Sequence, residues 1–97
     1  MNKEEARRLA DEALKPLRSL SYEQLLAEYF KNPHTSEVVG HDGQQYQIEV
    51  EAMWDSRKAR TLRVFACADD GSVRWGMTTW SPCCAFTIGP DGTYTDA

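Results

Sequence analysis

The sequence predicts an α+β fold, in which one or two N-terminal helices pack on one face of an antiparallel meander sheet of roughly four to six strands. Apolar residues recur at helical spacing as far as Phe30, and from Glu37 onward they alternate with polar residues. Short turn motifs separate the alternating segments, so the strands are expected to follow one another in chain order. The 97 residues suit one domain over 1–97, with a helical part at 3–31 and the sheet at 37–95.

Two helices are expected in the helical part. The first has one apolar face, formed by Ala6, Leu9, Ala10, Ala13, Leu14 and Leu17. Pro16 is expected to end or kink it one or two residues earlier, because proline lacks an N–H and crowds the residue before it. The second helix follows Ser21, which forms the Ser-x-x-Gln pattern of a capping box with Gln24, and it is expected over 22–31, before Asn32-Pro33. Its stripe should provide most of the cover for the sheet: Leu25, Leu26, Tyr29 and Phe30.

The alternation typical of half-buried strands occurs at 46–54, 62–68, 73–77 and 84–88. The dipeptide Asp70-Gly71 predicts a two-residue hairpin between the second and third of these segments. This hairpin would pair Ala66 with Trp75 and Val64 with Met77, so that apolar residues lie opposite one another.

The preceding hairpin is expected to fold about Arg57, because that register also matches apolar residues across the strands. The resulting pairs are Ile48 with Ala66, Val50 with Val64, and Ala52 with Leu62. The same register places Glu51 opposite Arg63, as a cross-strand ion pair. Both hairpins bury one face, and this assigns to the core Tyr46, Ile48, Val50, Leu62, Val64, Trp75 and Met77.

Composition and charge exclude some classes of function. The net charge of −4 argues against nucleic acid as the main partner, since binding to phosphates requires a basic surface. No apolar run approaches the ~20 residues of a membrane-spanning helix, so no membrane partner is expected. The charged start lacks the apolar core of an export signal, and the odd count of three cysteines is untypical of a secreted disulfide scaffold. A cytoplasmic location is therefore expected.

No catalytic, metal or cofactor site is predicted, and the chain is not expected to be an enzyme. The cysteines Cys67, Cys83 and Cys84 lack the paired spacing of zinc ligands, with His34 or His41 the nearest candidates to complete a site. We expect a buried Cys84 and an exposed Cys67 and Cys83. Cys83 has no histidine placed beside it to activate a nucleophile.

Two surface features are candidates for binding. Arg57, Lys58, Arg60, Arg63 and Arg74 form a basic cluster, which suits an anion or an acidic partner but also a solvated turn. On the sheet face away from the helices, Phe65 and its neighbours form an apolar patch with arginines beside it. The candidate interaction face consists of Met53, Arg63, Phe65, Arg74 and Trp80.

Several segments carry a resemblance: YQIEV (46–50), WD (54–55), LRV (62–64), DDG (69–71) with Arg74, and PDG (90–92). In these the chain resembles a group of small uncharacterised bacterial proteins, a domain of unknown function. The resemblance covers about residues 37 to 95 and implies a compact mixed fold in a bacterial cell. It implies no activity and no site residues.

The leading functional hypothesis is a small non-enzymatic protein-interaction domain that uses its outer sheet face, with a second protein or a second copy as partner. One alternative is a small-ligand binding protein or an enzyme, with a pocket between helices and sheet near Tyr29, Trp54 and Trp75. Another is an immunity-type or accessory protein, which the acidic net charge would suit.

Overall fold

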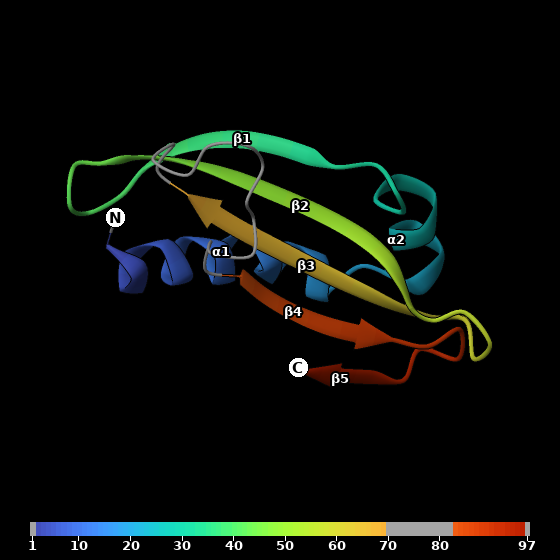
Figure 1. Ribbon diagram of the computed structural model, residues 1–97. Coiled ribbons are helices and arrows are strands. Elements are labelled where there is room, and N and C mark those ends of the chain that lie inside the picture. Colours follow the sequence, from blue (N-terminus) through green and yellow to red (C-terminus); the bar gives the residue numbers. More distant parts are fainter. Residues whose placement is uncertain (1, 70–82, 97) are drawn as a thin grey trace.

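The computed structural model describes residues 2–69 and 83–96, and in these it confirms the α+β class, with two helices packed on a five-stranded antiparallel sheet (Figure 1). The helices are α1 (Lys3–Arg18) and α2 (Tyr22–Glu28). The strands are β1 (His34–Val39), β2 (Gln45–Ser56), β3 (Thr61–Asp69), β4 (Cys83–Ile88) and β5 (Tyr94–Asp96). The sheet has the order β1-β2-β3-β4-β5, as expected for a meander. No helix in these two ranges is long and apolar enough to cross a membrane.

Helix α1 continues past Pro16 to Arg18, so the expectation that the helix ends at Leu14 or Lys15 is wrong. The proline lies in the last turn, where it removes one helical hydrogen bond and leaves most of the helix intact. Leu17 is buried and holds this turn against the sheet. At the other end, the Asn2 side chain accepts a hydrogen bond from the Glu5 N–H at 3.1 Å and caps the helix.

Helix α2 begins with the expected capping box. The Gln24 N–H donates to Ser21 Oγ at 3.1 Å, and the Ser21 N–H donates to Gln24 Oε1 at 2.9 Å. The helix is shorter than predicted because the next residues pair with β2 instead. The Ala52 N–H donates to the Tyr29 carbonyl, and the Lys31 N–H donates to the Ala52 carbonyl, both at 2.9 Å.

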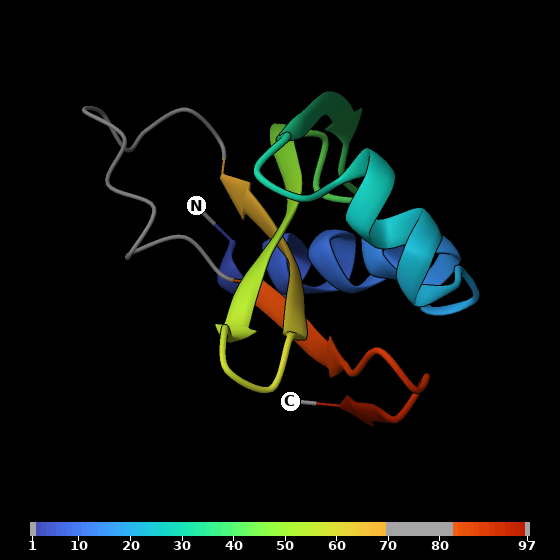
Figure 2. The ribbon, with the colours of Figure 1, turned by 90° about the vertical axis from the view of Figure 1, so that its right-hand side faces the viewer.

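Helix α1 lies along the inner face of the sheet in contact with β2, β3 and β4, whereas α2 lies at one end (Figures 1 and 2). The expectation that the α2 stripe provides most of the cover is therefore wrong. The 16-residue α1 is long enough to follow the strands, while α2 has seven residues. The largest fully buried side chains come from both helices and the inner face: Tyr46, Phe86, Leu14, Leu25, Leu62 and Val64.

The hairpin of β2 and β3 is displaced by two positions from the predicted register. Val50 pairs with Ala66 and Ala52 pairs with Val64, so the hairpin does not fold about Arg57. The turn causes the difference, because Arg60 adopts a left-handed φ of 58° and the ladder has a bulge between Trp54 and Ser56. A displacement of two keeps every side chain on its face, so the predicted core positions on β2 and β3 are confirmed.

Three further pairings differ from the sequence prediction. Glu51 lies opposite Phe65 rather than Arg63, which lies opposite Met53. Strand β3 has β2 on one side and β4 on the other, so the predicted pairing of 64–66 with 75–77 is wrong: Val64 pairs with Phe86. The predicted turn at Asp70-Gly71 and the strand at 73–77 lie outside the described residues, as do the core assignments of Trp75 and Met77.

Candidate functional site

The outer face is the side of the sheet opposite α1, and it brings three of the five predicted interaction residues together. Met53 and Arg63 are paired across β2 and β3, and Phe65 follows two positions along β3 on the same face. Met53 is 41% exposed, Arg63 is exposed and Phe65 is half-buried. The alternation of the strands therefore places the apolar pair Met53 and Phe65 on one face with Arg63. Arg74 and Trp80 lie outside the described residues.

Carboxylates surround this apolar pair. The described outer-face positions of the five strands carry five acidic side chains, Glu37, Glu49, Glu51, Asp55 and Asp69, and one basic side chain, Arg63. Arg63 Nη1 lies 3.9 Å from Asp55 Oδ1. The described part of the face is thus acidic, with apolar side chains at its centre.

A polar hollow adjoins the outer face near Arg63. It has a volume of about 420 Å³ and lies between the β2–β3 turn and the β4–β5 hairpin. Four of its lining residues are threonines, Thr61, Thr87, Thr93 and Thr95. Since Thr87 pairs with Arg63, the hollow begins directly beside the apolar patch.

The cysteine predictions need correction. Cys67 and Cys83 form a disulfide bond between paired positions of β3 and β4, with an S–S distance of 2.04 Å, and Cys67 is buried. Pairing of β3 with β4 brings the two Cα atoms to 4.1 Å, which the predicted strand order did not allow. Cys84 is half-buried and outside this disulfide, and its Sγ donates to the Arg7 carbonyl oxygen at 3.7 Å. The cysteine argument for a cytoplasmic location is lost, because disulfides persist in oxidising compartments.

A hydrogen-bonded latch joins α1 to the β1–β2 turn. The Glu5 carboxylate accepts hydrogen bonds from Arg8 Nε at 2.7 Å and Arg8 Nη2 at 2.8 Å, and it accepts another from the His41 N–H. These hydrogen bonds lower the pKa of Glu5 to about 2, and the bonds from Arg8 have the largest effect. Gly40 is needed here, because a Cβ at this position would lie 2.8 Å from Glu5 Oε2.

A buried tyrosine near the start of β2 is hydrogen-bonded to the same turn. The Tyr46 hydroxyl donates to Asp42 Oδ2 at 2.7 Å, and this bond, with burial, raises the pKa of Tyr46 to about 12. The pKa values of Tyr46 and Glu5 both lie far from neutrality. Neither group changes its protonation state near neutral pH, and we therefore assign the latch a structural role.

The latch predicts a pH dependence of stability. The pKa of Glu5 is about 2 in the folded chain and 4.5 without these hydrogen bonds, as in the unfolded chain. The ionised carboxylate therefore stabilises the fold, and this stabilisation is complete above pH 4.5. This contribution should be lost as the pH falls from 4.5 towards 2. Glu5→Gln should therefore lower the melting temperature at neutral pH, with the difference from wild type vanishing at the acid end. Thermal denaturation at a series of pH values measures this.

The control is Glu4→Gln, which makes the same change at an exposed neighbouring carboxylate. It should leave the neutral melting temperature close to that of wild type. A difference between Glu5→Gln and wild type that stays constant down to pH 2 would contradict the role given to the carboxylate charge.

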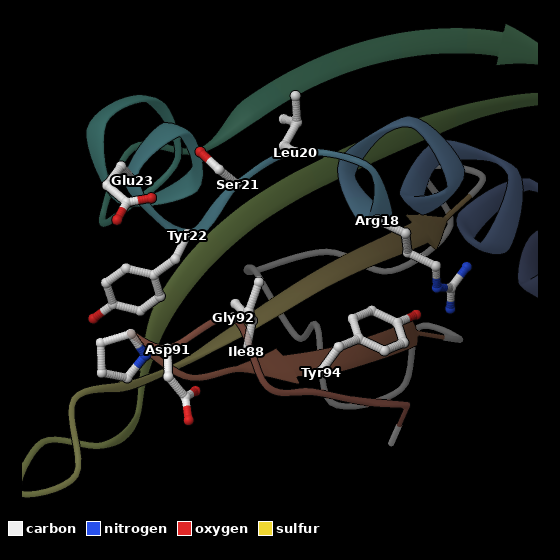
Figure 3. A pocket seen from close by; sticks show the side chains of 10 residues that line it. Arg18, Leu20, Ser21, Tyr22, Glu23, Ile88, Asp91, Gly92 and Tyr94 are labelled. Atoms are coloured by element: carbon white, nitrogen blue, oxygen red, sulfur yellow. The ribbon is translucent and has the colours of Figure 1, made fainter.

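A cleft of about 430 Å³ lies between the α1–α2 junction and the β4–β5 hairpin (Figure 3). Arg18 stands at one end and Glu23 at the other, with Tyr94 and Asp91 on the side of the hairpin. The Arg18 guanidinium donates to Asp11 Oδ1 at 3.3 Å. The cleft therefore combines groups of both charges with an aromatic wall.

This cleft is distinct from the pocket that the sequence suggested near Tyr29 and Trp54. Tyr29 packs against the His34 ring with centroids 4.3 Å apart, and Trp54 packs against Phe30 at 4.9 Å. Trp75 lies outside the described residues. Within the described residues, no group of three or more His, Cys, Asp or Glu side chains is arranged to hold a metal ion.

Comparison of the chain with protein-family models, with curated proteins and with solved structures found no match.

Proposed function

We propose that the chain is a non-enzymatic protein-binding domain whose outer face meets a partner protein. The observation that carries this proposal is the placement of Met53 and Phe65 at diagonal positions of β2 and β3, on the sheet face opposite α1. Exposed apolar side chains with an arginine at their edge are characteristic of interface centres, because they lose water on binding. Arg63 and the hollow that begins at Thr87 would supply the polar rim.

The charge of the face indicates the kind of partner. Carboxylates on β1, β2 and β3 surround the apolar pair, and complementary charge steers association and rejects partners of like charge. We therefore expect a partner with basic groups around an apolar site. An immunity-type or accessory protein that neutralises a basic neighbour would bind in this way, so that hypothesis becomes one form of the proposal.

The test is affinity capture from the native cell, with wild type and a Met53→Ser/Phe65→Ser double variant as baits. The partner should be captured by wild type and should bind the variant at least about tenfold more weakly, because truncation of a central residue costs about 2 kcal/mol. Glu12→Ser serves as the control, since it changes an exposed side chain on α1 away from the outer face. Circular dichroism establishes that both variants are folded. Identical capture by wild type and the double variant would remove the proposal.

The cleft beside Arg18 and Tyr94 favours a second candidate, a small-ligand binding protein. Its volume of about 430 Å³ suits a small molecule that carries both charge signs. A thermal-shift screen tests it, since a ligand raises the melting temperature by mass action. A true hit should lose its effect in Glu23→Arg, which alters one wall at an exposed position. Hits that stabilise both proteins equally would speak against the cleft.

A further inference from the structure

Among the described strands, β1 lies at one edge of the sheet, and the side of its backbone that faces away from β2 pairs with none of the others (Figure 1). It is six residues long, and its register with β2 is continuous over its whole length. The other edge of the sheet, β5, has three residues. Natural proteins commonly protect an edge strand by shortness, lysine, proline or a bulge, and β1 has none of these.

The hydrogen-bond pattern shows which backbone groups point outward. The Gly40 N–H donates to the Gln44 carbonyl at 2.8 Å, next to the Val39–Gln45 pair. Hydrogen-bonded pairs alternate with non-hydrogen-bonded pairs along an antiparallel ladder, so the even positions of β1 bond to β2. The N–H and C=O groups of Thr35, Glu37 and Val39 consequently point away from β2.

The side chains of these three residues lie on the outer face. Val39 is 68% exposed, and Glu37 carries a negative charge. The outer positions of β1 and β2 hold four carboxylates and no basic side chain: Glu37, Glu49, Glu51 and Asp55. A second copy of the chain would place two such acidic surfaces next to each other, whereas a basic segment would complement them.

We propose that β1 binds an extended, basic segment of the partner as an additional strand of the sheet. The inference rests on the proposed function and specifies how the partner is held. Main-chain hydrogen bonds to Thr35, Glu37 and Val39 provide the affinity, and alternate side chains of the segment lie on the outer face. The segment side chains opposite Thr35, Glu37 and Val39 share the outer face, and the one opposite Glu37 is a lysine or arginine.

The probes are two short synthetic peptides, one alternating lysine with valine and the other alternating glutamate with valine. Amide exchange followed by NMR should show slower exchange at Thr35, Glu37 and Val39 with the lysine peptide and no change with the glutamate peptide. Protection by neither peptide overturns the proposal. Equal protection by both overturns it as well, because the acidic side chains would then select nothing.

Glu37→Pro tests the backbone contact. The Glu37 N–H is not used by β2, so proline is compatible with the strand and removes one outward donor. The lysine peptide should bind this variant about three- to tenfold more weakly, the effect of about one hydrogen bond. Unchanged binding overturns the proposal. Glu37→Gln is the matched variant: it keeps the N–H and should reduce the preference for the lysine peptide over the glutamate peptide.

Two outcomes separate this inference from the proposed function. If the captured partner is lost with Met53→Ser/Phe65→Ser but retained with Glu37→Pro, the outer face binds the partner and the edge-strand inference fails. If wild type is a dimer in solution that Glu37→Pro dissociates, a second copy occupies the edge and the basic segment is ruled out. Amide protection in the wild-type protein decides the case should Glu37→Pro fail to fold.

Discussion

Replacing Cys67 and Cys83 together by alanine is expected to lower the free energy of unfolding by about 3 kcal/mol. The bond closes a loop with a sequence separation of 16, and closing a loop of this length removes about that much free energy from the unfolded chain in the loop-entropy model. Urea denaturation of the oxidised wild type and of the double variant measures the difference. Wild type in excess reductant should approach the variant.

Cys84→Ala is the matched control, because it removes a thiol on the neighbouring residue without opening the disulfide. Excess reductant should lower its stability by as much as it lowers that of wild type, since both oxidised proteins contain the Cys67–Cys83 bond. Equal stability of the oxidised wild type and the Cys67→Ala/Cys83→Ala variant would show that the bond does not form in solution. The cysteines would then again be consistent with the expected location of the chain in a reducing cytoplasm.

Leu14→Ala is expected to destabilise the fold by about 2–5 kcal/mol. Leu14 is fully buried on the face of α1 that covers the sheet, so truncation leaves a cavity between helix and strands. Chemical denaturation measures the loss. Lys15→Ala changes the next, exposed residue of the same helix and should alter stability by less than about 0.5 kcal/mol. A small effect of Leu14→Ala would mean that α1 does not dock on the sheet in solution.

The sequence was sufficient for the fold class and for the two faces of β2 and β3, because alternation records which side of a strand is buried. It could not fix the register of their hairpin, since a displacement of two leaves Val50 and Val64 on the same face. The left-handed conformation of Arg60, a residue type that seldom adopts it, gave no signal in the turn.

The sequence did not predict the disulfide or the latch, because each depends on which segments of the chain meet in the fold. Cys67 meets Cys83 only because β3 pairs with β4, and the Asp-Gly step suggested a nearer neighbour for β3. The contact of Glu5 with the His41 N–H joins residues far apart in the chain, and a carboxylate on the first helical turn reads as an ordinary solvated charge. For the outer face, by contrast, alternation alone was enough to put Met53 and Phe65 on the same side of the sheet.

The helical layer is fastened to the sheet at both of its ends. Glu5 binds the β1–β2 turn through His41, and the Tyr22 hydroxyl donates to the Arg60 carbonyl in the β2–β3 turn at 2.6 Å (Figure 1). A sheet held at opposite ends has little freedom to change its twist when a partner binds to its outer face. Binding on the outer face would then order few backbone torsions, and its entropy cost would come mainly from side chains such as Met53 and Arg63.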